Sequence, residues 1–134
     1  MDFKKKCWKI FGKLLVGSSN YIFVIKRNFC RLTFRLEAAG NLSKFNLGVG
    51  QRFDVPVSVG GGSGRLIIGD HVGFGWRPAP KLGDGTILLE PRTLDAEIEI
   101  GSRAMFSNNI SVISMQKITI GDDCLIGDGT LIID

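Results

Sequence analysis

The feature that most constrains the fold of this chain is an aliphatic or aromatic residue that recurs every six positions beyond about Leu42. Glycine or another small residue often follows it directly, and the phrase Ile-Gly-Asp occurs at both Ile68–Asp70 and Ile120–Asp122. A hexapeptide period indicates a parallel β-helix, in which three hexapeptides, about 18 residues, make one triangular turn. The recurring residues are Leu47, Phe53, Val59, Ile68, Phe74, Ile100, Phe106, Val112, Ile120, Ile126 and Ile132.

Stacking of such turns predicts which side chains form the core. The bulky residue of each hexapeptide points into the prism, and a smaller inward residue follows four positions later. We therefore expect an all-β parallel β-helix in which successive turns align their inward residues in columns. A β-sandwich is the alternative, but its strands would alternate with a period of two and would not keep a step of six. The expected columns are Ile68, Ile100 and Ile120; Phe53, Phe74, Phe106 and Ile126; and Val72, Ala104 and Cys124.

Departures from the regular turn length locate an inserted loop. Ile68 and Ile100 are 32 positions apart, about 14 more than one turn needs. We expect this excess to leave the prism within residues 76–97, a stretch that contains the turn signal Gly83-Asp84-Gly85. Because the scaffold does not require the loop, it is the expected place for ligand or partner contacts.

The N-terminal part of the chain follows a different pattern. Between Phe3 and Val16 the apolar residues recur at steps of three and four, which predicts a short amphipathic helix. The stretch 17–20 (Gly-Ser-Ser-Asn) is expected to break it, and for residues 21–36 we favour a second helix over a strand. The chain is thus expected to divide into a basic, apolar, helical segment, residues 1–41, and a β-helix, residues 42–134.

Charge is divided unevenly along the chain. Residues 1–36 carry nine basic residues and one acidic residue, whereas the remainder carries eight basic and twelve acidic residues, for a total of +4. A nucleic-acid-binding domain carries its basic residues on the folded domain itself, so we expect no nucleic-acid partner. Two interpretations of the basic segment stay open: a solvated helix face, or a peripheral contact of residues 1–36 with anionic lipid headgroups.

Several composition features narrow the class of protein. No window approaches 18 uncharged apolar residues, so no membrane span is expected. The three cysteines, Cys7, Cys30 and Cys124, are odd in number and widely spaced, which favours a reducing compartment. We expect a cytoplasmic protein, at the inner face of the membrane if the basic segment binds lipid. The single histidine, His71, argues against sites that need two or three imidazoles, including the zinc site of a γ-type carbonic anhydrase, and no metal is expected.

The residues from Ile118 to Asp134 carry a resemblance to a known family. With their consecutive hexapeptides and the Ile-Gly-Asp phrase, they closely resemble the hexapeptide-repeat acyltransferases, which fold as a left-handed β-helix. The chain is similar in particular to the bacterial O-acetyltransferases of polysaccharide and lipopolysaccharide assembly, over residues 42–134. The resemblance implies transfer of an acetyl group from acetyl-CoA to a sugar hydroxyl, on a free or lipid-linked saccharide, in a homotrimer with active sites between neighbouring prisms.

The same resemblance implies a histidine as general base. In this family the histidine follows an Ile-x-Asp phrase by a few residues, and here that phrase is Ile132-Ile133-Asp134. The catalytic base is therefore expected after Asp134, and the catalytic residues within these 134 positions are unknown. Two interpretations follow: an N-terminal portion of an acetyltransferase, or a non-catalytic structural or regulatory subunit of a trimer. His71 is expected to be a corner residue that points away from the prism.

Four residues are candidates for an acceptor site. Asn108 and Asn109 match a turn where related sugar acetyltransferases carry an asparagine, although asparagine also favours tight corners. Asp134 matches the carboxylate near the family's base, or is a corner residue itself. Trp76 would stack on a sugar ring, or pack under its own loop.

Overall fold

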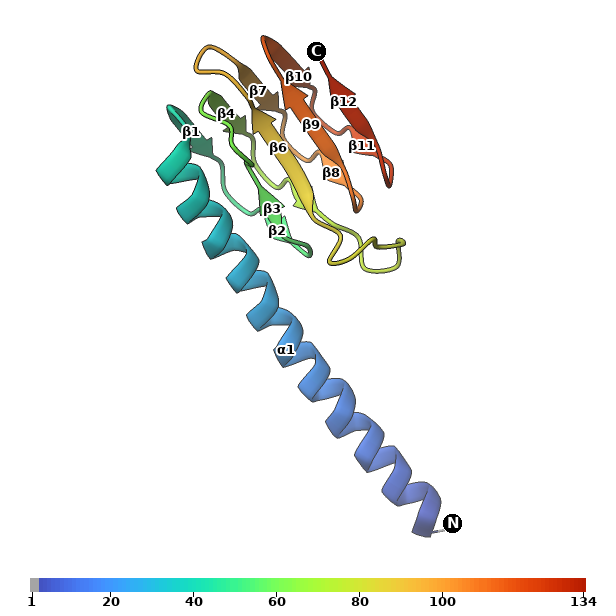
Figure 1. Ribbon diagram of the computed structural model, residues 1–134. Coiled ribbons are helices and arrows are strands. Elements are labelled where there is room, and N and C mark those ends of the chain that lie inside the picture. The colour runs from blue at the N-terminus through green and yellow to red at the C-terminus, as the bar shows by residue number, and fades with distance from the viewer. Residues whose placement is uncertain (1–2) are drawn as a thin grey trace.

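A single long helix followed by a parallel β-solenoid of about four turns makes up the computed structural model (Figure 1). It describes residues 3–134, apart from the side chains of residues 3–8, 11, 15 and 16. The predicted parallel β-helix of hexapeptide repeats is confirmed. The predicted short helix is instead a long one, and it accounts for nearly all of the segment before the solenoid.

The helix α1 (Phe3–Asn41) is 39 residues long and continuous, so the predicted break at residues 17–20 is wrong. At 1.5 Å per residue, α1 is about 58 Å long. Glycine in an exposed helix costs about 1 kcal/mol relative to alanine, and serine or asparagine costs less. No proline precedes Pro56. The stretch 17–20 therefore weakens the helix locally without removing a hydrogen bond from it.

Each turn of the solenoid contributes one strand to each of three parallel sheets. The sheets have the strand orders β1-β4-β7-β10, β2-β5-β8-β11 and β3-β6-β9-β12. The strands are β1 (Lys44–Leu47), β2 (Arg52–Phe53), β3 (Val57–Ser58), β4 (Arg65–Ile68), β5 (Gly73–Phe74), β6 (Ile87–Pro91), β7 (Glu97–Ile100), β8 (Met105–Phe106), β9 (Ser111–Ser114), β10 (Lys117–Ile120), β11 (Leu125–Ile126) and β12 (Leu131–Ile133).

The strand register aligns the inward residues as predicted. Ile68 pairs with Ile100, which pairs with Ile120, and Leu47 extends this column into the first turn. The second column is largely aromatic: the ring centroids of Phe53 and Phe74 lie 5.2 Å apart, and those of Phe74 and Phe106 lie 5.3 Å apart. Ile126 continues this column in the fourth turn. Burial of these side chains supplies most of the driving force that stacks the turns, about 1.5–3 kcal/mol for each large residue.

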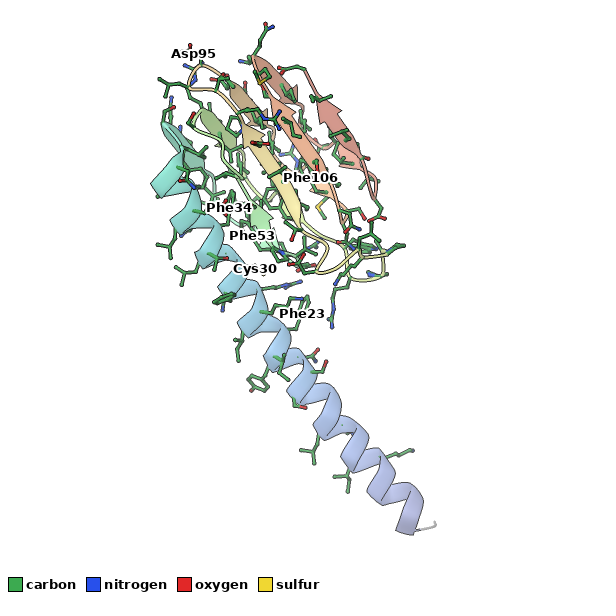
Figure 2. The ribbon with its side chains drawn as sticks, in the orientation of Figure 1. Phe23, Cys30, Phe34, Phe53, Asp95 and Phe106 are labelled. Carbon is green, nitrogen blue, oxygen red and sulfur yellow. The ribbon has the colours of Figure 1, made fainter. Side chains whose placement is uncertain are left out.

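The C-terminal part of α1 covers the open end of the first turn (Figure 2). Phe34 is fully buried, and its ring centroid lies 5.5 Å from that of Phe53, so it adds one more ring to the aromatic column. Cys30 and Ala38, one turn of helix away on either side, are buried with it. The Glu37 carboxylate accepts hydrogen bonds from the Ser58 hydroxyl (2.8 Å) and the Val59 amide (3.0 Å). The helix thus closes the core where the first turn has no preceding turn to stack on.

The N-terminal part of α1 extends away from the solenoid (Figure 1). Within residues 3–134, no helix combines the length and the apolar character needed to cross a membrane. The side chains of Lys4, Lys5 and Lys6, which belong to the predicted basic segment, lie outside the described residues.

The inserted loop joins β5 to β6 and consists of residues 75–86. The predicted window, residues 76–97, covers most of this loop and also strand β6, which returns the chain to the prism at Ile87. Nearly all of the loop's side chains are exposed to solvent, and Leu82 is 81% exposed. The loop is therefore held by something other than an apolar core of its own.

Candidate functional site

The inserted loop, residues 75–86, is fixed to the solenoid by two asparagines of the third turn. Asn108 and Asn109 occupy the corner between β8 and β9, one turn beyond the strand from which the loop departs. Asn109 has a φ of 58°, in the left-handed region that asparagine tolerates better than most residues. A corner position was one of the two interpretations of these residues, beside an acceptor-site role, and both direct their amides at the loop.

The Asn108 side chain is completely buried, and its amide is fully used by the loop backbone. Its Oδ1 accepts a hydrogen bond from the Trp76 amide (2.9 Å). Its Nδ2 donates to the carbonyl oxygens of Trp76 (2.9 Å), Ala79 (3.1 Å) and Pro80 (3.2 Å). A sugar hydroxyl would have to displace one of these partners to reach Asn108. In this structure the amide anchors the loop.

Asn109 makes the corresponding contacts closer to solvent. Its Oδ1 accepts from the Leu82 amide (3.0 Å), and its Nδ2 donates to the Pro80 carbonyl oxygen (3.2 Å) and to Asp128 Oδ1 (3.4 Å). Asn109 is thus half-buried and connects the loop to the corner of the fourth turn.

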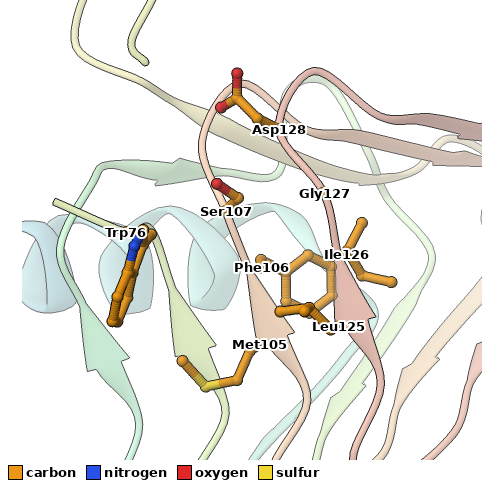
Figure 3. Close-up of a pocket in the computed structure, with 8 residues that line it drawn as sticks. All are labelled: Trp76, Met105, Phe106, Ser107, Leu125, Ile126, Gly127 and Asp128. Carbon is orange, nitrogen blue, oxygen red and sulfur yellow. The ribbon is translucent and has the colours of Figure 1, made fainter. Parts of the chain in front are cut away.

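A groove of about 490 Å³ lies on the outer side of the sheet that contains β8 and β11, next to the start of the loop (Figure 3). Its walls are mostly apolar, and Ser107 and Asp128 lie together at one end, away from Met105. Such a groove suits an extended, mainly apolar ligand with a polar group at one end. The lining residues are Trp76, Met105, Phe106, Ser107, Leu125, Ile126, Gly127 and Asp128.

Trp76 forms one wall of the groove, and half of its surface is exposed. The Arg52 guanidinium lies 5.7 Å from the centroid of its ring, which places a cation near the indole face. The ring therefore neither packs under its own loop nor points freely into solvent. It lines a concave surface, and its stacking on a sugar ring stays a prediction.

Met105 and Leu125 were not predicted as site residues. They are register partners on β8 and β11, and they point outward although apolar, with Leu125 81% exposed. The Met105 side chain lies over Gly73 of β5, where an added Cβ would be only 2.6 Å from the Met105 Cε. An apolar residue at an outward position of a hexapeptide was the signal available in the sequence.

Asp134 directly follows β12 and lies away from this groove, against the corner between β9 and β10 of the preceding turn. Its carboxylate accepts hydrogen bonds from the Met115 amide (2.5 Å), the Lys117 amide (2.7 Å) and the Ser114 hydroxyl (3.0 Å). The Met115 amide contributes most to lowering the pKa of the Asp134 carboxyl below its usual range, and the Ser114 hydroxyl adds to it. Here Asp134 acts as a corner residue, which was the alternative interpretation of its position.

His71 lies at the corner before β5, exposed, with a φ of 56°. It lies over Gly50, where an added Cβ would collide with its ring. The structure thus brings Trp76, Asn108 and Asn109 together at the loop, and it places His71 and Asp134 at other corners.

Comparison of the chain with models of protein families, with curated proteins and with solved structures finds no match. The geometry of the solenoid, its loop and its groove therefore carries the functional argument.

Proposed function

We propose that the solenoid belongs to an O-acetyltransferase that moves an acetyl group from acetyl-CoA to a sugar hydroxyl during the synthesis of bacterial surface polysaccharide. The observation that carries the proposal is the groove beside Trp76, built on a hexapeptide solenoid next to a loop that the solenoid does not need. In the reaction, the acceptor oxygen attacks the thioester carbonyl carbon, the C–S bond breaks, and the thiol leaves with the proton of the hydroxyl.

The groove offers one surface for the acetyl donor and another for the acceptor hydroxyl. We assign Trp76, Met105 and Leu125 to the thioester arm of the donor, because they form its apolar walls. Ser107 and Asp128 lie at the polar end, where a hydroxyl and a carboxylate can hydrogen-bond to an acceptor hydroxyl. We assign no general base among these residues, and a neighbouring copy in a homotrimer would complete the site.

The first test is donor binding. Substitution of Trp8 by Phe leaves Trp76 as the only tryptophan, so its fluorescence reports on the groove. Acetyl-CoA should change this emission saturably. Leu125→Asp places a carboxylate in the groove and should weaken binding about tenfold. Leu131→Asp is the matched control, because Leu131 is an exposed leucine of the fourth turn that does not line the groove. An unaltered affinity in Leu125→Asp would refute the assignment.

The second candidate function is that of a non-catalytic subunit in a trimer on the same scaffold. It is favoured by the contacts of Asn108, Asn109 and Asp134, which the chain's own backbone engages. Analytical ultracentrifugation together with the binding experiment separates the two functions. A trimer that does not bind acetyl-CoA would support the subunit, whereas saturable binding that Leu125→Asp weakens supports the transferase.

The exposed face of α1 suits a peripheral contact with the inner, anionic surface of the membrane, which would bring a lipid-linked acceptor near a cytoplasmic enzyme. Among the described side chains of α1, nine apolar ones are each more than half exposed, and most of them lie on the side opposite Cys30, Phe34 and Ala38. The helix carries no acidic residue between Phe3 and Leu36, so a second copy of it would bring like charges together. The nine residues are Ile10, Leu14, Tyr21, Ile22, Val24, Ile25, Phe29, Leu32 and Leu36.

Co-sedimentation tests this contact. The protein should bind phosphatidylcholine vesicles that contain phosphatidylglycerol, and binding should weaken with added salt. Ile25→Asp combined with Leu32→Asp should abolish binding, because it puts charges in the apolar face. Binding unchanged by the double substitution would reduce this face to a solvated helix surface, and a lower oligomeric state of the variant would indicate helix–helix contact instead.

A further inference from the structure

A second, polar cavity of about 230 Å³ lies where α1 meets the second strand of the first turn. Three arginines line it, two from the helix and one from β2, together with two carboxamides. This cavity is separate from the groove beside Trp76 and shares no residue with it. Its lining residues are Arg27, Asn28, Arg31, Gln51, Arg52 and Phe53.

One carboxylate faces this cluster and does not balance its charge. Asp54, which is 4% exposed, lies 2.5 Å from Arg27 Nε and 3.1 Å from Arg52 Nε. Arg31 forms no ion pair among the described residues, and its Nε is buried without a hydrogen-bond partner. Three guanidinium groups against one carboxylate leave two positive charges at the cavity.

The carboxamides add polar groups with unused capacity. Gln51 is 7% exposed, and its Nε2 donates to the Gly69 carbonyl oxygen (2.8 Å), which fixes the amide in place. Its Oε1 is buried without a donor. A buried polar atom without a partner costs about 1–3 kcal/mol. The residues around the cavity thus include an unpaired cationic donor and an unpaired acceptor, and the cavity is large enough for a small ion.

We propose that this cavity binds a phosphate group. A phosphate oxyanion accepts hydrogen bonds from guanidinium groups, which match its geometry well. A singly protonated phosphate also carries one P–OH, which can donate to Gln51 Oε1. Binding would satisfy both orphaned atoms and offset the excess positive charge. The proposal is independent of acetyl transfer, because no residue of the groove takes part.

The position of Asn28 connects the cavity to the exposed face of α1. Asn28 is exposed and lies one helical turn from both Val24 and Leu32, two residues of the apolar face. The phosphate can therefore come from the headgroup of a lipid that lies against this face, or from a free phosphate compound. Both sources use the same chemistry.

Thermal unfolding in inorganic phosphate, compared with chloride at equal ionic strength, tests the site. Phosphate should raise the melting temperature of the unaltered protein. Arg31→Gln should weaken phosphate binding about tenfold, the value of one lost charge-assisted hydrogen bond. Asn28→Asp should also weaken phosphate binding, because it brings a carboxylate to the cavity. Residue 28 is an exposed helix position that tolerates substitution. Arg35→Gln is the control, since it removes an equal charge from the same helix but does not line the cavity.

Vesicles distinguish the two sources. If the source is a lipid, Arg31→Gln should weaken binding to vesicles that contain phosphatidic acid, a phosphate monoester. It should weaken binding to vesicles that contain phosphatidylglycerol, a phosphate diester, by less. If the source is a free compound, phosphate should no longer raise the melting temperature of Arg31→Gln, and the binding of this variant to vesicles should be unchanged. Either result supports the site. Equal stabilisation by chloride and phosphate, or full retention of the phosphate effect in both Arg31→Gln and Asn28→Asp, would overturn it.

Discussion

Two segments of this protein lie outside the prism, and they are attached to it in opposite ways. The helix α1 is attached by burial: Cys30, Phe34 and Ala38 are almost completely inaccessible, and the Phe34 ring continues the aromatic column. The loop 75–86 buries only two of its residues, Gly75 and Gly85, and is held by the amides of Asn108 and Asn109. Burial stabilises the whole fold, whereas hydrogen bonds to a loop control its local opening. The comparison therefore predicts global effects at one attachment and local effects at the other.

The largest effect is expected from Phe34→Ala. Removal of a fully buried phenylalanine typically costs about 3–5 kcal/mol, and here it would also open the end of the core. Urea unfolding followed by circular dichroism measures the loss. Phe29→Ala is the matched control on the same helix, because Phe29 is 66% exposed and should change stability by less than about 0.5 kcal/mol. Similar losses for the two variants would show that α1 does not close the core.

A smaller and more local effect is expected from Asn108→Ala. The change leaves the Trp76 amide and three loop carbonyl groups without their side-chain partner, which costs about 2 kcal/mol. Hydrogen exchange at the Trp76 amide should accelerate more than exchange in β4 or β7. Asn109→Gly, which keeps the left-handed backbone but removes the amide, should accelerate exchange at the Leu82 amide alone. Uniform acceleration across the solenoid would contradict a local anchoring role.

Glu37 tests the polar part of the helix attachment. Glu37→Ala removes the acceptor for the Ser58 hydroxyl and the Val59 amide and should cost about 1 kcal/mol, measured by urea unfolding. Glu37→Gln keeps an acceptor oxygen and should restore most of that loss. A loss larger than that of Phe34→Ala would reverse the order of the two contributions.

The smallest expected effect is a pH dependence of the loop. The Thr86 hydroxyl and amide donate to Asp84, and the hydroxyl contributes most to lowering the pKa of the Asp84 carboxyl. The pKa of the Asp84 carboxyl is thus lower in the folded protein than in the unfolded chain. Such a carboxyl stabilises the fold at pH values above the unfolded-state pKa, and this stabilisation is lost as the pH falls through the folded-state pKa. Exchange of the Thr86 amide should therefore accelerate, beyond the intrinsic pH trend, below about pH 4. Asp84→Asn should remove this dependence, and its persistence would assign the effect elsewhere.

The periodic part of the fold could be predicted from the sequence because it is local. A step of six residues fixes which side chains face inward, and the same step in successive turns fixes the register of Phe53, Phe74 and Phe106. The predicted helix break at residues 17–20 was wrong because it was based on residue types and not on a repeated spacing. Glycine and serine are weak helix formers, but only proline removes the backbone donor that would interrupt the helix.

The candidate site depended on contacts that the repeat does not encode. The type and position of Asn108 could be predicted, but the capture of its amide by Trp76, Ala79 and Pro80 depends on the path of the loop. The same holds for Trp76, whose exposure in a groove follows from where Met105 and Leu125 of later turns lie.

The sequence by itself determined the parallel solenoid, its inward columns and the existence of an inserted loop, since each follows from residue spacing along the chain. Only the tertiary structure decided that α1 covers the first turn, that Asn108 anchors the loop, and that Arg27, Arg31 and Arg52 surround one cavity. These arrangements join residues that are distant in sequence. Their energies come from packing and charge in three dimensions, which a local period does not specify.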